Sequence, residues 1–116
     1  MKFPITRESL RTYDYKTELE ELRKEEIEKC FTVALNYLCD DFRKHIRSNP
    51  KDTRFVWHKL QTYHRSFRIE GLLTQEVFDL TSDKHLYRFV DTLKELFIGC
   101  DIIVDPLKTY VIIDWL

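Results

Sequence analysis

The chain has 116 residues, of which 43% are hydrophobic and 34% charged, and its formal charge is −1. This is the composition of one globular domain and excludes a disordered or fibrous chain. The sequence has no run of about 18 apolar residues and no apolar stretch near its start, so it predicts neither a membrane span nor a secretory signal.

A long helix is the first element that the pattern predicts, over residues 17–48 after an N-terminal arm over residues 1–16. Thr17 suits the first position of a capping box, and apolar residues then follow at three- and four-residue steps. Some 30 residues span roughly 45 Å, which is more than one small core covers. Either the helix breaks, or its first half contacts a partner through Leu19 and Leu22.

Residues 53–68 contain no acid and interleave basic with aromatic side chains. The spacing of the apolar positions predicts a second helix. Aromatic rings stack on unpaired bases while basic groups neutralise phosphates, so the segment 54–68 is a candidate nucleic-acid site. Its proposed contacts are Arg54, Trp57, Lys59, Tyr63, Arg65 and Arg68. In the alternative interpretation, its apolar residues belong to the core and its basic residues form a solvated face.

Three shorter elements are expected next. Phe67 to Glu70 alternates like a short strand, and Thr74 can cap a short helix that runs to Leu80. The clearest amphipathic pattern then begins after an N-cap at Ser82, and Gly99 ends it.

A β-hairpin is predicted over the last part of the sequence. Asp105-Pro106-Leu107-Lys108 suits a type I turn, which pairs Val104 with Thr109. Trp115 falls on the apolar face of this hairpin, and we expect it to be a core residue. The face should pack on Phe89, Leu93 and Phe97.

The expected fold is therefore α+β: one small helix-rich domain over residues 1–116 with a long N-terminal helix and a C-terminal antiparallel hairpin. Residues 53–116 should hold the remaining helices and that hairpin. The order strand, helix, helix, two-stranded wing is also that of a winged helix, so a winged-helix-like core is one arrangement that fits.

The motifs of enzymes and metal sites are missing from the sequence. It contains no CxxC, no GxSxG and no glycine-rich loop, and its three cysteines are scattered. We expect no catalysis, no metal, no cofactor and no small-molecule substrate. An odd set of scattered cysteines also favours reduced thiols, hence a soluble protein of a reducing intracellular compartment.

Charge is distributed unevenly: −1 over residues 1–37, +5 over residues 38–68 and −5 over residues 69–116. The expected recognition helix would present both signs outward, which suits protein contacts better than a phosphate-lined groove. The sequence therefore predicts a non-catalytic protein-interaction or structural subunit of a larger assembly, with another protein or a second copy as its partner. The alternative is a winged-helix-like nucleic-acid-binding module that uses residues 54–68.

Overall fold

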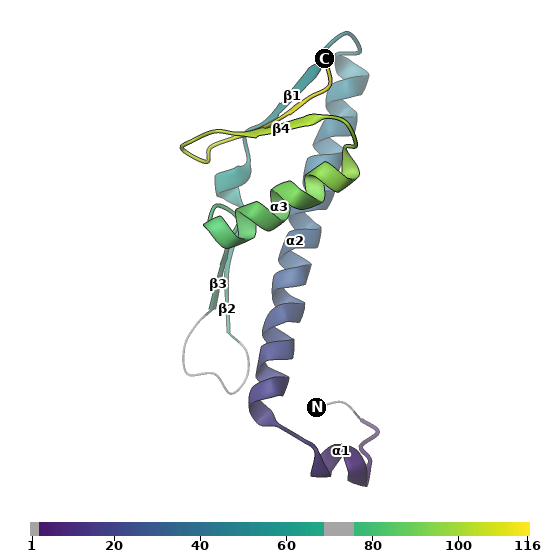
Figure 1. Cartoon of the computed structure of the whole chain (residues 1–116), viewed down its shortest axis with the longest axis vertical. Helices are drawn as coiled ribbons and strands as arrows, with labels where there is room; N and C mark the ends of the chain where they lie inside the picture. Colours follow the sequence, from purple (N-terminus) through teal and green to yellow (C-terminus); the bar gives the residue numbers. More distant parts are fainter. Residues whose placement is uncertain (1–2, 69–75) are drawn as a thin grey trace.

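The computed structural model describes residues 3–68 and 76–116, which form an α+β fold with one long helix and two small antiparallel sheets (Figure 1). The helices are α1 (Arg7–Arg11), α2 (Tyr15–Ser48) and α3 (Asp83–Leu96), with a 3-10 turn η1 at Leu60–Thr62. The strands are β1 (Arg54–Trp57), β2 (His64–Phe67), β3 (Glu76–Asp79), β4 (Asp101–Val104) and β5 (Val111–Asp114). The expected α+β class, the long N-terminal helix and the C-terminal hairpin are confirmed.

Helix α2 is continuous over 34 residues, or about 51 Å, and accounts for most of the 61 Å long axis of the molecule. The radius of gyration is 18.5 Å, whereas a compact domain of this size has about 13 Å. The expected cap at Thr17 is wrong, because the helix begins after Asp14, whose carboxylate accepts from the backbone N–H of Lys16 at 3.0 Å. Thr17 instead donates its hydroxyl hydrogen to Asp14 at 2.9 Å.

The core lies against the second half of α2. From Tyr15 to Lys29 the helix contributes no fully buried residue. Its buried residues are Cys30, Phe31, Ala34 and Leu38. The first half runs beside the β2–β3 hairpin (Figure 1), and the ion pair of Arg23 with Glu76 at 3.0 Å joins the two.

Strand β5 is the centre of a three-stranded sheet with the order β1-β5-β4. Side chains directly opposite each other share a face, so the inner face comprises two cross-strand rows. One row is Trp57, Val111 and Val104, and the other row is Phe55, Ile113 and Ile102. The inner side chains of β1 and β5 are buried, and the face packs on α2 and α3.

The register of the hairpin differs from the expected one by two residues. Val104 lies opposite Val111, whereas the sequence predicted Thr109. The expected turn forms, because the N–H of Lys108 donates to the carbonyl of Asp105 at 2.8 Å, but Lys108 then adopts a positive φ of 58° and lengthens the loop. A shift of two preserves the alternation of faces, so the side chains expected on the apolar face still occupy it.

The second helix expected over residues 53–68 is wrong. These residues form β1, η1 and β2. Phe55 and Trp57 are buried at alternate positions because β1 pairs with β5 along its whole length. Pairing with a strand nearly 60 residues away thus decides the structure, and aromatic and β-branched residues suit it.

The short helix expected after Thr74 is wrong over residues 76–79, which form β3 paired with β2. Thr74 itself, and the residues 69–70 of the expected short strand, lie outside the described residues. A winged helix needs a helix where β3 is found. The described residues therefore do not have the winged-helix order.

Helix α3 confirms the clearest sequence pattern. Ser82 is its N-cap, and Gly99 follows its end with a φ of +81°. Phe89 and Leu93 are fully buried beneath the sheet, as expected. Trp115 packs against the core, edge-on to Phe42 with 5.7 Å between ring centroids, but it is only half-buried, so the expectation that it is a core residue holds only in part.

Candidate functional site

Two basic side chains of the candidate nucleic-acid segment are paired with carboxylates of the chain itself. Arg54 on β1 bonds to Asp114 on β5 at 3.0 Å. Lys59 bonds to Asp41 on α2 at 2.8 Å, and this contact is the main reason why the pKa of Asp41 is lowered. Much of the positive charge in this segment is therefore neutralised within the fold.

The other two basic side chains face the acidic first half of α2. Arg65 and Arg68 line a cleft together with Glu25 and Glu26. A phosphate that approached these arginines would also meet two carboxylates, which weakens the attraction. The geometry gives this cleft little preference for a polyanion.

The aromatic residues of the segment are directed into the core. Trp57 is 2% exposed, and its ring is stacked between Tyr63 at 5.4 Å and Phe89 at 5.9 Å. Its indole N–H donates to Asp41 at 3.0 Å. Tyr63 is half-buried. Neither face of the indole is open to a base, so the role of Trp57 is to stabilise the fold and not to stack on a nucleotide.

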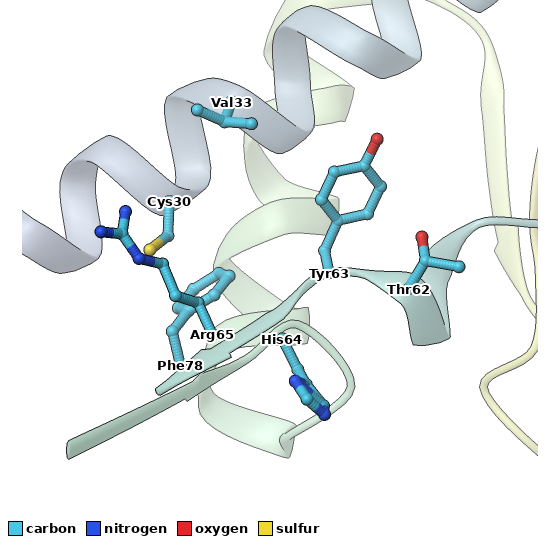
Figure 2. Close-up of a pocket in the computed structure, with 7 residues that line it drawn as sticks. All are labelled: Cys30, Val33, Thr62, Tyr63, His64, Arg65 and Phe78. Carbon is cyan, nitrogen blue, oxygen red and sulfur yellow. The ribbon is translucent and has the colours of Figure 1, made fainter. Parts of the chain in front are cut away.

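Figure 2 shows a cleft of about 130 Å³ between α2 and the η1–β2 segment, where the guanidinium of Arg65 lies beside the thiol of Cys30. It is lined by Cys30, Val33, Thr62, Tyr63, His64, Arg65 and Phe78. Burial raises the pKa of Cys30, and Arg65 acts in the opposite direction without reversing the change. Because the reactive form of cysteine is the thiolate, a raised pKa leaves this thiol unactivated at neutral pH.

The predicted partner contacts Leu19 and Leu22 are half-buried against the rest of the chain. Leu22 lines the same cleft as Phe67 of β2. Strands β2 and β3 therefore cover part of the apolar surface on the first half of α2 that the sequence analysis assigned to a partner. A smaller apolar surface on this half of the helix remains for a partner.

A groove of about 290 Å³ lies between α3 and the β4–β5 hairpin. It is lined by Asp83, Leu86, Tyr87, Val90, Val104 and Lys108. Most of these side chains are apolar, and the ion pair between Asp83 and Lys108 joins the helix to the hairpin loop. The inner side chains of β5 are fully buried, so the groove opens on the β4 side of the sheet.

Strand β4 is an edge of the sheet, and the backbone geometry shows which of its groups are open. The N–H of Asp105 donates to the carbonyl of Tyr110 at 3.1 Å, and hydrogen-bonded pairs recur at every second residue of an antiparallel ladder. Ile103 therefore bonds to β5. The N–H and C=O groups of Ile102 and Val104 point to the other side, where no strand of the described chain pairs with them.

Both the helix and the hairpin loop beside this groove expose an apolar side chain. Tyr87 on α3 is 74% exposed and Leu107 in the hairpin loop is 78% exposed. Exposed apolar side chains on both elements that form a groove are typical of interaction sites, so this groove is the best candidate.

Sequence reasoning did not find this groove. With residues 54–57 expected in a helix, both strands of the hairpin were expected to be edges, and nothing indicated that β1 would pair with β5 and leave β4 as the unpaired side of the hairpin. One signal for the groove was present in the sequence. Tyr87 lies outside the apolar stripe of α3, so its aromatic ring cannot reach the core and is left on the surface.

Among residues 3–68 and 76–116, no group of three His, Cys, Asp or Glu side chains is arranged to hold a metal ion. The helices in this part of the chain lack the combined length and apolar character that a bilayer span requires. No family model matches the chain, and neither a curated protein nor a solved structure matches it.

Proposed function

We propose that this chain is a non-catalytic protein-interaction module that binds an extended segment of a partner protein along β4. The observation that supports this most is the unpaired edge of β4 beside the apolar groove of α3. A peptide strand added to such an edge gains main-chain hydrogen bonds, and every second side chain reaches the groove.

The occupant is an extended polypeptide because of what the edge offers. Ile102 and Val104 present two donors and two acceptors, which a neighbouring strand satisfies together. At a net 0.5–1.5 kcal/mol each, four hydrogen bonds contribute about 2–6 kcal/mol. Burial of peptide side chains against Tyr87 and Val90 adds to this, and ordering of the peptide subtracts from it. Binding in the micromolar range, roughly −8 kcal/mol, is the expected result.

The test is to pan a phage-displayed library of random ten-residue peptides against the full chain and to measure the selected peptides by fluorescence anisotropy. Tyr87→Glu places a charge in the groove at an exposed position. Val104→Pro removes an N–H that points away from β5, a position where an edge strand tolerates proline. Each should weaken binding at least tenfold. Val77→Glu, at a 57% exposed apolar position on β3, is the matched control and should bind as the unchanged chain does.

Peptides that bind the Val104→Pro chain, shown to be folded by its thermal melt, as tightly as the unchanged chain would refute the proposal. A dimer seen by light scattering that Val104→Pro dissociates would mean that the edge pairs with a second copy. Salt-dependent binding of single-stranded oligonucleotides that is lost in Arg65→Ala and Arg68→Ala, two exposed positions of the segment, would favour the nucleic-acid alternative.

A further inference from the structure

We propose that a second site, between α2 and α3, binds the phosphate group of a small molecule. A cleft of about 130 Å³ separates the two helices there. It is lined by Lys24, Ile27, Glu28, Lys84, His85 and Arg88. At 100° per residue, the α3 residues of this cleft lie on a different side of the helix from Tyr87 and Val90, so the site is separate from the peptide groove.

The charges around the cleft favour an anion. Lys24, Lys84 and Arg88 contribute three positive charges, and Glu28 is the one carboxylate among the lining residues. That carboxylate is bound by Arg88. In the described part of the chain, Lys24 and Lys84 have no ion-pair partner, so their charges are available to a ligand.

Arg88 is held in place before any ligand arrives. Its guanidinium carbon lies 4.3 Å from the centre of the Phe31 ring, and its N–H groups bind Glu28. A guanidinium has five N–H donors, and a single carboxylate occupies at most two of them. The remaining donors can serve an oxyanion at little cost in side-chain entropy.

His85 is oriented in the same way. Its Nδ1 lies 3.1 Å from the carbonyl oxygen of Asp79 and 3.0 Å from the hydroxyl of Ser82. A carbonyl can only accept, so Nδ1 carries the hydrogen and donates to Asp79. In the neutral ring Nε2 then has no hydrogen and can only accept, so His85 lines the cleft without donating to a phosphate oxygen. The donors come from Lys24, Lys84 and Arg88.

The position of the cleft on α3 adds to the attraction. Lys84 and His85 belong to the first turn of this helix, where the macrodipole is positive. The side chain of Ser82 does not cap that turn. A phosphate group carries more charge than a carboxylate at neutral pH and offers three acceptor oxygens, which suits several convergent donors. The volume of about 130 Å³ admits one phosphate group.

The test is a titration of the full chain with inorganic phosphate, followed by two-dimensional amide NMR at constant ionic strength. The amides of Lys24, Lys84, His85 and Arg88 should shift along saturable curves with a millimolar Kd. Lys24→Ala and Lys84→Ala should each weaken binding about five- to tenfold. Lys94→Ala, the same change on α3 outside the cleft, should leave the Kd unchanged.

Linear, unsaturable shifts, or an equal loss of affinity in Lys94→Ala, would show general charge screening and overturn the proposal. A thermal melt of each variant checks that it is folded. If phosphoserine binds more tightly than inorganic phosphate, the ligand is an organic phosphate. If inorganic phosphate binds more tightly, the ligand is the free ion. The peptide groove shares no residue with this cleft, so failure here leaves the proposed function untouched.

Discussion

Replacement of Trp57 by phenylalanine should destabilise the fold more than the same change at the other tryptophan. The indole of Trp57 is 2% exposed, and it is stacked between Tyr63 and Phe89. Its N–H donates to the carboxylate of Asp41 at 3.0 Å, and Asp41 also binds Lys59. Trp57→Phe keeps an aromatic ring in the stack but removes the donor and part of the ring.

The magnitude follows from these two losses. A hydrogen bond to a charged partner contributes about 1.5–3 kcal/mol. The smaller ring leaves a gap in a close-packed site, which costs about 1 kcal/mol more. The free energy of unfolding should therefore fall by about 2.5–4 kcal/mol, a large fraction of the roughly 5–15 kcal/mol typical of a natural domain.

Trp115→Phe is the matched control. Trp115 is half-buried, and its indole N–H has no hydrogen bond within the part of the chain that the structure describes. Its loss should cost less than about 1.5 kcal/mol. Urea unfolding followed by far-UV circular dichroism measures both variants without relying on tryptophan fluorescence. If the two variants lose equal free energy of unfolding, or if Trp115→Phe loses more, the conclusion that Trp57 lies at the centre of the core would be refuted.

Two further predictions concern acid stability and the end of α3. The hydrogen bond from Lys59 lowers the pKa of Asp41 in the folded chain. The ionised Asp41 carboxylate therefore stabilises the fold fully above the ordinary aspartate pKa of about 3.9, and this stabilisation is lost as the pH falls through the lower pKa of the folded chain. Urea midpoints at pH 5 and pH 3 should differ less in Asp41→Asn than in the unchanged chain, and an unaltered difference would contradict this. Gly99 has a φ of +81° and open space where a Cβ would lie, so Gly99→Ala should cost about 1–2 kcal/mol from backbone strain alone. A thermal melt checks this, and an unchanged melting temperature would count against it.

The helices were largely predictable because their signals are local. The apolar spacing of α2 and α3, the N-cap at Ser82 and the stop at Gly99 all act within a few residues. The strand β1 was not predictable in this way. Val56, Leu60, Tyr63 and Phe67 fit a helical spacing, whereas Phe55 and Trp57 fit an alternating one, and pairing with β5 decides between the two patterns.

The hairpin and the candidate groove show the same limit. The turn at Asp105 was predictable from its proline, but the register depends on the left-handed conformation of Lys108, which glycine or asparagine would have signalled and lysine does not. The groove lies where β4 packs beside α3, and the pairing of β1 with β5 leaves β4 as the open strand of the hairpin. Tyr87 was the one residue whose exposed position on α3 pointed to it.

Amide hydrogen exchange across β4, with and without a selected peptide, tests the central claim most directly. In the free chain the amide of Ile103, which donates to β5, should be protected, while those of Ile102 and Val104 should exchange rapidly. A bound peptide should slow the exchange of Ile102 and Val104 and leave Ile103 little changed. Equal protection of all three amides in the free monomer, or no slowing when the peptide binds, would contradict an open edge that recruits a partner strand.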